Sequence, residues 1–145
     1  MVPSSWEDVQ MIRTSLAALV LAAAFAAPAM AADSSPADVV ARHMQNAGKN
    51  DVAAVLADYA DDAVVLTSQG QATQGKAAIG AMFKTILAPG GAASNIKTTK
   101  VWSDGDVGFV SWEAGLVKGV DMFVVRHGKI EVQSVFIGGG APAGR

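Results

Sequence analysis

The sequence contains no cysteine, one tyrosine and only two histidines among its 145 residues. Without thiols the chain can form neither a disulfide nor a thiolate metal site. The two histidines, His43 and His127, belong to different predicted elements and show no metal-ligand spacing, so we predict no metal. An excess of charge is lacking too, with 13 acidic against 11 basic residues and no basic stripe, so nucleic acid is not indicated as a partner.

Motifs for nucleotide binding are also missing. The sequence has no dinucleotide fingerprint and no nucleophile motif, and no helix follows the glycine run at 138–140, as it would in a phosphate loop. We therefore expect no cofactor. After residue 31 no apolar run is long enough to cross a membrane, so we expect no membrane partner once the segment described next is removed.

The N-terminal region has the pattern of an export signal. Arg13 supplies a positive charge, residues 16–27 are apolar and uncharged, and Ala29-Met30-Ala31 is a small-residue cleavage site. We interpret residues 11–31 as a cleavable signal peptide and expect a periplasmic or secreted protein. The alternative is an anchoring N-terminal helix.

The first ten residues do not fit this signal. Glu7 and Asp8 are acidic where the start of an export signal is basic. We interpret residues 1–10 as a start-site artefact and expect translation to begin at Met11.

The remaining chain is of single-domain size, with a domain at 32–137 and a flexible, Gly- and Pro-rich tail at 138–145. Hydrophobic periodicity predicts helices at 36–47, 52–59 and 76–87, and strands at 63–67, 96–102, 107–117, 120–126 and 130–137. Turns are expected at Asp61-Asp62, Lys118-Gly119 and His127-Gly128. Helices followed by hairpins predict an α+β domain, in which three helices cover one face of a curved antiparallel sheet and leave a pocket between the two layers.

Three stretches carry a family resemblance: Val39-Val40-Ala41-Arg42-His43 continuing to Asn50-Asp51; Leu56 to Val65 followed by Gly75-Lys76-Ala77-Ala78-Ile79; and Val120 to Ile130. Together with the order of elements, they resemble the nuclear-transport-factor-2-like (NTF2-like) superfamily, within it the polyketide-cyclase (SnoaL-like) and ketosteroid-isomerase-like proteins. The resemblance implies a cone-shaped fold, a pocket between helices and sheet, and a homodimer formed through the convex sheet face.

The resemblance also supplies site residues. Ketosteroid isomerases use an aspartate base, and a tyrosine and a protonated aspartic acid form their oxyanion hole. Matching the motifs places Thr67 at the base, His43 at the tyrosine and Asp121 at the aspartic acid. The base of steroid isomerases is therefore missing, and whether the chain is an enzyme stays open.

Asp121 and His43 are the first two candidate catalytic residues. The resemblance turns Asp121 inward with Phe123, where desolvation would raise its pKa and let it donate a proton. Alternatively, Asp121 only satisfies backbone groups near the turn at 118–119. His43 lies on the buried face of the first helix, either as a hydrogen-bonded core residue or as a donor or base toward a ligand.

Glu113 is the third candidate catalytic residue. Along strand 107–117 it belongs to a set that includes Ser111 and alternates with a more apolar set that includes Trp112. Either the apolar set faces the pocket and Glu113 is solvated, or the apolar set forms a dimer interface and Glu113 points into the cavity near Asp121. The family register favours the second arrangement.

The candidate ligand-binding residues are Thr67, Phe123, Ser111, Gln133 and Tyr59. For Tyr59 and Phe123 the alternative is a core position, and for Gln133 a solvated strand position. Two functions follow: an exported, cofactor-free acid/base enzyme of isomerase, cyclase or hydrolase type on a small apolar substrate, or a non-catalytic domain that binds a small ligand and dimerises.

Overall fold

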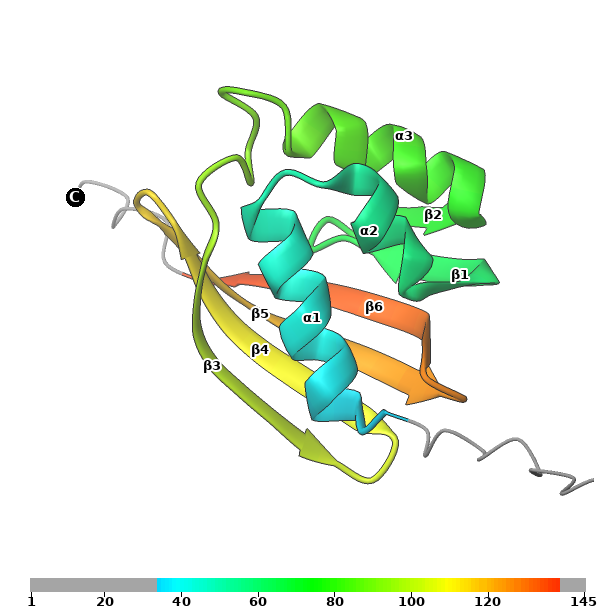
Figure 1. The fold of residues 1–145 in the computed structure, drawn as a ribbon. Coiled ribbons are helices and arrows are strands. Elements are labelled where there is room, and N and C mark those ends of the chain that lie inside the picture. The colour runs from blue at the N-terminus through cyan, green and yellow to red at the C-terminus, as the bar shows by residue number, and fades with distance from the viewer. Residues whose placement is uncertain (1–33, 139–145) are drawn as a thin grey trace, which may run out of the picture. The chain divides into compact units, whose positions relative to one another are not determined.

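The computed structural model describes residues 34–138 (Figure 1). The predicted signal peptide, the residues interpreted as a start-site artefact and the tail beyond residue 138 lie outside the described residues. Within the described part, no helix is both long and apolar enough to span a membrane.

Helices lead and strands follow, as the sequence predicts. The elements in chain order are α1 (Pro36–Gly48), α2 (Val52–Ala57), β1 (Tyr59–Leu66), β2 (Ala72–Gln74), α3 (Lys76–Ile86), β3 (Lys97–Asp104), β4 (Val107–Ala114), β5 (Val117–Arg126) and β6 (Lys129–Gly138). The predicted α+β class is confirmed.

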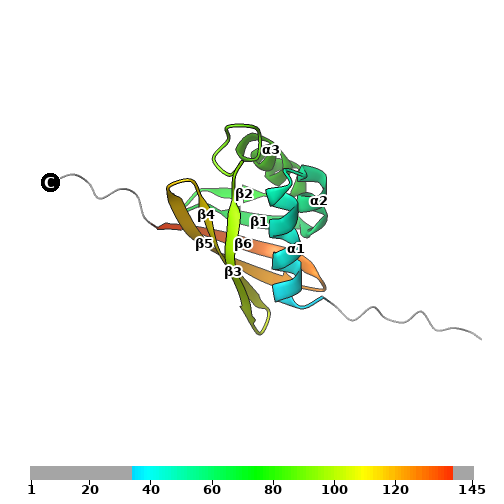
Figure 2. The same ribbon diagram turned by 60° about the vertical axis from the view of Figure 1, so that its left-hand side comes forward.

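The six strands form one sheet in the order β2-β1-β6-β5-β4-β3. All neighbours are antiparallel except β1 and β6, which are parallel. The sheet is curved, and the helices lie over its concave face (Figures 1 and 2). Helix α1 packs against β3, β4 and β5, whereas α3 packs against β1 and β2, so the two helices cover different parts of the sheet.

Helix α1 begins and packs as its sequence predicts. Ser35 caps the helix by accepting a hydrogen bond from the backbone N–H of Asp38, and Pro36 occupies the first turn. Its predicted buried face is confirmed. The helix lies close to β4, because a Cβ atom on Gly108 would stand 2.7 Å from the side chain of Val40.

The predicted second helix is too long. Helix α2 ends at Ala57, and Tyr59 begins strand β1 rather than closing the helix. The Asp61-Asp62 pair lies within β1, not in a turn. A non-local contact explains the difference, because β1 pairs with β6 and the N–H of Ile130 donates to the Asp58 carbonyl at the helix end.

The hairpin between β4 and β5 also differs from its prediction. The turn lies at Gly115-Leu116, where Gly115 adopts a φ of 61° that suits glycine. Lys118 and Gly119, predicted as the turn, lie within β5. The turn at His127-Gly128 is confirmed. The corrected turn changes which residues of β4 and β5 are cross-strand partners, so that Trp112 lies opposite Gly119.

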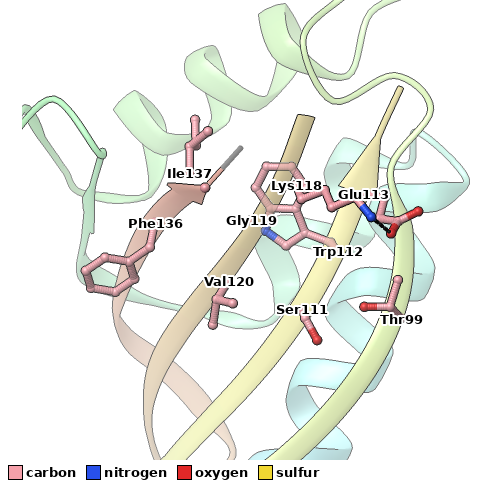
Figure 3. Close-up of a pocket in the computed structure, with 10 residues that line it drawn as sticks. Thr99, Ser111, Trp112, Glu113, Lys118, Gly119, Val120, Phe136 and Ile137 are labelled. Carbon is pink, nitrogen blue, oxygen red and sulfur yellow. Dashed lines mark hydrogen bonds and ion pairs between the residues drawn. The ribbon is translucent and has the colours of Figure 1, made fainter. Parts of the chain in front are cut away.

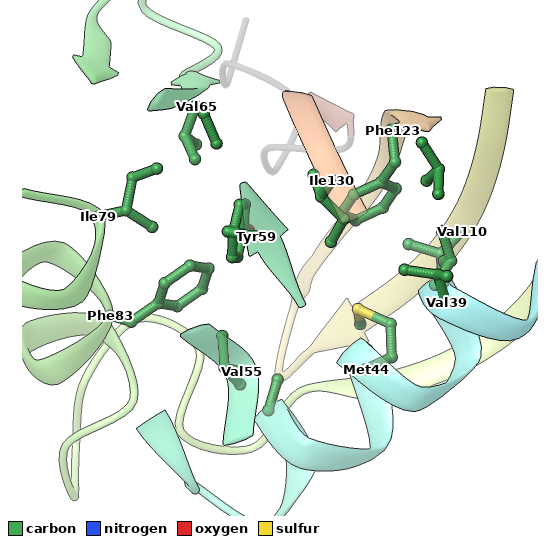
Figure 4. Close-up of a cluster of buried hydrophobic side chains, with 14 of the residues drawn as sticks. Val39, Met44, Val55, Tyr59, Val65, Ile79, Phe83, Val110, Phe123 and Ile130 are labelled. Atoms are coloured by element: carbon green, nitrogen blue, oxygen red, sulfur yellow. The ribbon is translucent and has the colours of Figure 1, made fainter. Parts of the chain in front are cut away.

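The core lies between the helices and the concave face of the sheet. Figure 4 shows buried side chains from all three helices and from strands β1, β4, β5 and β6, among them Val39, Met44, Val55, Tyr59, Val65, Ile79, Phe83, Val110, Phe123 and Ile130. Each large apolar side chain buried in this way contributes about 1.5–3 kcal/mol relative to exposure. This layer holds α1 and α3 over the sheet and frames the cavity between them.

Candidate active site

A cavity of about 400 Å³ lies between the helices and the concave face of the sheet. Its volume falls within the range of about 300–1,000 Å³ that is typical of small-molecule sites. Most of the lining is apolar. Helices α1 and α3 contribute Met44, Met82, Phe83 and Ile86, Leu87 directly follows α3, and β6 contributes Val135 and Ile137. Among the described residues, no lysine or arginine lines the cavity.

Asp121 is the acidic residue that lines this cavity, and its side chain is buried. The indole Nε1 of Trp112 donates to Asp121 Oδ1 at 2.8 Å, and Gln133 Nε2 donates to Oδ2 at 2.7 Å. Burial raises the pKa of Asp121 to about 6, although both hydrogen bonds pull it down. The inward orientation predicted for Asp121 is confirmed.

Trp112 reaches Asp121 because of a glycine on the neighbouring strand. Trp112 and Gly119 are cross-strand partners, and a Cβ atom on Gly119 would stand 2.2 Å from the indole ring. The ring therefore lies over the bare glycine backbone, and its N–H meets the carboxyl two residues further along β5. Trp112 was not among the predicted site residues; its place in the apolar set of β4 is the signal that could have identified it.

Gln133 is held from its other side by Tyr59. The Tyr59 hydroxyl donates to Gln133 Oε1, while the Gln133 amide nitrogen donates to Asp121. Tyr59 is fully buried, and burial raises its pKa well above the ordinary value, so its hydroxyl keeps its proton at neutral pH. A chain of hydrogen bonds thus runs from β1 through β6 to β5.

His43 projects from the buried face of α1 and lines the cavity. Its ring makes edge-on contacts with three aromatic rings, at centroid distances of 5.4 Å to Tyr59, 5.8 Å to Phe83 and 5.4 Å to Phe123. Its Nδ1 has no hydrogen-bond partner among the described residues. Burial, and secondarily the charge of Arg42, lowers the pKa of His43 to about 4, so the ring is neutral at pH 7 and a weak base.

The orientation favoured for Glu113 is wrong. Val110 and Trp112 face the helices, so Ser111 and Glu113 lie on the opposite face of β4. Glu113 accepts a hydrogen bond from Lys118 Nζ at 2.8 Å, and this contact lowers the pKa of its carboxyl. Neither Glu113 nor Ser111 lines the cavity that holds Asp121.

The other predicted ligand-binding residues divide into two layers. Thr67 and Gln133 line the cavity. Tyr59 and Phe123 are fully buried and lie outside its lining, packed against His43. The structure therefore brings Asp121, His43, Thr67 and Gln133 to one cavity, with the two aromatic rings supporting it.

A second, shallow groove lies on the face of the sheet that points away from the helices (Figure 3). It is lined by Ser111, Glu113, Lys118 and the exposed apolar side chains of Val120 and Phe136. The Glu113 carboxyl in this groove is already paired with Lys118. The groove is therefore less suited to proton transfer than the cavity that holds Asp121. Within residues 34–138, no group of three or more His, Asp or Glu side chains could hold a metal ion.

Comparisons with known proteins agree with this architecture. A family model described as "SnoaL-like domain" matches residues 40–133. No curated protein matches the chain. Similar solved structures include an NTF2-like protein of unknown function from Burkholderia xenovorans, 18% identical, covering 73% of this chain and 84% of that one with a TM-score of 0.61.

Two further structures carry functional descriptions. A putative polyketide cyclase from Sinorhizobium meliloti is 26% identical, with 68% of this chain and 93% of that one covered and a TM-score of 0.58. SalBIII, an epoxide hydrolase/cyclase-like enzyme with a role in pyran ring formation in salinomycin, is 21% identical, with 69% and 88% covered and a TM-score of 0.57. With the family match spanning most of the chain, these findings show that the protein belongs to the SnoaL-like domain family and has the NTF2-like fold.

Proposed function

We propose that this protein is a cofactor-free acid/base enzyme that acts on a small, mostly apolar substrate in the cavity between helices and sheet. Asp121 is the residue that exchanges a proton with the substrate. The observation that carries the proposal is the setting of this carboxyl: it lies buried in an apolar cavity and is fixed at both oxygens by N–H donors.

The chemistry follows from this setting. A carboxyl with a pKa of about 6 exchanges a proton readily near neutral pH, which suits a general acid or base. In its protonated form Asp121 donates to an oxygen of the substrate; in its ionised form it removes a proton. His43 stays neutral and supplies hydrogen bonding rather than charge.

The number of cavity side chains that can exchange a proton near neutral pH limits which reaction types fit the site. A single carboxyl can remove a proton in one step and return it in a later one, which serves isomerisation and cyclisation alike, whereas hydrolysis that activates water while protonating a leaving group uses two groups. Here Asp121 titrates near neutrality, whereas the pKa of His43 lies far below it. Among isomerase, cyclase and hydrolase chemistry, isomerisation and cyclisation fit best, since in both one carboxyl can take a proton from one substrate atom and return it to another.

The descriptions of similar proteins support an enzymatic function in general terms. The similar proteins described as a putative polyketide cyclase and an epoxide hydrolase/cyclase-like enzyme are enzymes by description, on the same fold. Their descriptions support small-molecule chemistry in the cavity.

Proton exchange at carbon tests the proposal without knowledge of the natural substrate. Residues 32–145 are incubated in D₂O with a panel of small cyclic ketones, and deuterium entry beside the carbonyl is followed by NMR. We expect exchange that depends on Asp121, is reduced in Asp121→Asn, and follows a pKa near 6. Exchange that is equal in the two proteins would overturn the proposal.

The alternative is a non-catalytic protein that binds a small ligand in the same cavity. Thr67 at the position where the resemblance places the base favours it, because a hydroxyl cannot take over the role of a carboxylate at neutral pH. Native mass spectrometry of protein purified from its own host would show a retained ligand. A retained ligand that is recovered unchanged, together with no proton exchange on any ketone, would favour this second function.

We also propose that the domain works after export. The pattern of residues 11–31 supports a periplasmic or secreted location. N-terminal sequencing of the mature protein should give Ala32 as the first residue, and sequencing of the precursor should give Met11. A mature protein that keeps residues 11–31 would contradict export by cleavage.

We also propose that the protein forms a homodimer through the outer face of the sheet. Phe136 is 57% exposed there and pairs across strands with Val120, and Leu66 on β1 is exposed as well. Burying such side chains against a second copy would contribute about 25 cal/mol per Å² of apolar surface. Light scattering should show a dimer for the wild type and a monomer for Phe136→Asp; a monomeric wild type would sink the idea.

A further inference from the structure

The hairpin that joins β4 and β5 extends beyond the strands on either side of it. The first cross-strand pair of β3 joins Lys97 to Glu113 of β4. The last pair of β6 joins Gly138 to Lys118 of β5. Residues 114–117 thus lie past the ends of both neighbouring strands, at the end of the sheet where Figure 1 shows this hairpin.

The hairpin tip carries a large apolar side chain where turns usually carry polar ones. Leu116 is 94% exposed, and the adjacent Val117 is 39% exposed. Ile137, near the end of β6, is 50% exposed. Because Val117 and Ile137 also line the cavity, they lie where it opens to solvent. Single exposed apolar side chains are ordinary, but these three, here called the apolar rim, gather at one opening.

Lysines flank the apolar rim. Lys97, Glu113 and Lys118 are successive cross-strand neighbours at this end of the sheet, and Lys100 follows along β3. Among residues 97–100 and 111–118, Glu113 is the one acidic residue against three lysines. The opposite end of the same sheet has an acidic excess, with Asp104, Asp106 and Glu131 against Arg126 and Lys129. The end that bears the apolar rim is therefore the basic end.

The size of the apolar rim favours a bilayer over a protein as its partner. The other exposed large apolar residues, Leu66, Val120 and Phe136, belong to the outer face proposed for the homodimer. A stable protein interface buries about 800 Å² on each partner, roughly 20–30 residues, which a rim of this size cannot supply. Binding at a membrane surface needs less, since a few apolar side chains enter the headgroup region while lysines face anionic lipids.

We propose that the apolar rim inserts into the surface of an anionic bilayer and brings the opening of the cavity against it. The β1–β2 side of the opening, with Ser68 and Gln69, is polar and would stay in water. A substrate that dissolves in lipid would then reach the cavity without crossing water. Such contact needs no membrane-spanning helix, and the sequence-based expectation of no membrane partner rested only on the lack of an apolar run long enough to span.

Vesicle binding tests this surface directly. Residues 32–145 are mixed with vesicles of phosphatidylglycerol or of phosphatidylcholine, and the bound protein is separated by flotation. We expect binding to phosphatidylglycerol that weakens as salt is added, and binding to phosphatidylcholine that is at least about fivefold weaker, since that lipid has no net charge to attract the lysines. A wild type that does not bind phosphatidylglycerol vesicles would overturn the proposal.

Substitutions of Leu116 assign the contact to the apolar rim. Leu116→Ser should bind phosphatidylglycerol vesicles about tenfold more weakly, the factor that burial of one leucine supports. Leu116→Phe keeps an apolar side chain and should bind as the wild type does. Because Leu116 is almost fully exposed, both variants should fold, which circular dichroism checks. Equal binding by Leu116→Ser and the wild type would refute the contact.

A matched pair of lysines tests the charge beside the rim. Lys118 pairs with Glu113, whereas Lys76, at the start of α3, pairs with Asp61, so each substitution by glutamine removes one ion-paired lysine. Lys118→Gln should lower the affinity for phosphatidylglycerol vesicles about fivefold, the ratio that one lysine near an anionic surface supports. Lys76→Gln should leave the affinity unchanged. Equal losses would mean general electrostatic attraction and would overturn the placement of the rim on the bilayer.

A second copy of the chain as the partner would give a different result. Without lipid, light scattering should give the same mass for Leu116→Ser and the wild type; a smaller mass for the variant would place the rim in a protein interface and overturn the proposal. Asp121→Asn should bind vesicles as the wild type does. Loss of vesicle binding and loss of proton exchange are therefore separate results, and either proposal can fail alone.

Discussion

The indole ring of Trp112 fills the space that a side chain at position 119 would need, since a Cβ atom on Gly119 would stand 2.2 Å from the ring. The same ring donates its N–H to Asp121, two residues beyond that glycine. The absence of a side chain at one position of β5 therefore sets the hydrogen bonding of the carboxyl at another. This relationship explains why the candidate site depends on Gly119, a residue without a functional group of its own.

Gly119→Ala should move the indole ring and break its hydrogen bond to Asp121. Because that bond favours the ionised carboxyl, the pKa of Asp121 should rise above its value of about 6. The overpacked ring and the lost bond should together lower the free energy of unfolding by about 2–4 kcal/mol. Carbon-13 NMR of the labelled carboxyl measures the pKa, and urea unfolding measures the stability.

A matched glycine in the next strand provides the control. A Cβ atom on Gly138 of β6 would meet nothing within 4 Å, so Gly138→Ala should change neither quantity noticeably. An Asp121 pKa that is the same in Gly119→Ala and Gly138→Ala would contradict the link between Gly119 and the carboxyl.

Asp121→Asn should alter how stability depends on pH. The pKa of Asp121 is about 6 in the folded protein against an ordinary value of 3.8, so the folded state binds more protons between these two values. The wild type is therefore stabilised by this group below pH 3.8 and loses the contribution as pH rises through 6. The free energy of unfolding of the variant minus that of the wild type should increase by up to about 3 kcal/mol from pH 4 to pH 8.

Urea unfolding of both proteins across this pH range gives the difference directly. Asparagine cannot titrate, so the comparison removes only the contribution of Asp121. Parallel curves for the two proteins would mean that the folded-state pKa of Asp121 is not raised.

His43→Leu should change the pH dependence of the free energy of unfolding in the opposite direction to Asp121→Asn. The pKa of His43 is about 4 in the folded protein against an ordinary 6.5, so the unfolded state binds more protons between these values. The contribution of His43 is full above pH 6.5 and is lost as pH falls through 4. Relative to the wild type, the leucine variant should therefore gain up to about 3 kcal/mol between pH 7 and pH 4. A difference that does not change with pH would show that the ring is not held neutral by burial.

Local sequence was sufficient to place His43, whereas the inward direction of Asp121 also depended on the family resemblance. Helical spacing puts His43 on the same face as Val39 and Val40, and alternation along β5 puts Asp121 on the same face as Phe123; the structure confirms both faces. Periodicity thus predicted which residues share a face, and the resemblance added which face of β5 points inward.

The register of the β4–β5 hairpin was not predictable in this way. Two glycines, Gly115 and Gly119, could each have formed the turn, and local sequence does not choose between them. The fit of the Trp112 ring over Gly119 is compatible with only one choice. That long-range contact places the turn at Gly115. The outer position of Glu113 has a separate cause, because Val110 and Trp112 of β4 face the helices and the alternating residues face away from them. The start of β1 at Tyr59 depends in the same way on pairing with β6, which local patterns do not reveal.

Glu113→Gln tests by function the observed orientation of β4, in which Glu113 faces away from the cavity. Glu113 lies on the outer face and is paired with Lys118, away from the cavity, so the variant should keep wild-type proton exchange and ligand affinity. Asp121→Asn, assayed beside it, should lose the exchange. At pH 8 both carboxyl groups are ionised, so the two substitutions change the charge of the protein equally. A loss of exchange in Glu113→Gln that matches the loss in Asp121→Asn would place Glu113 in the cavity and would contradict the orientation of β4 that turns Trp112 toward Asp121.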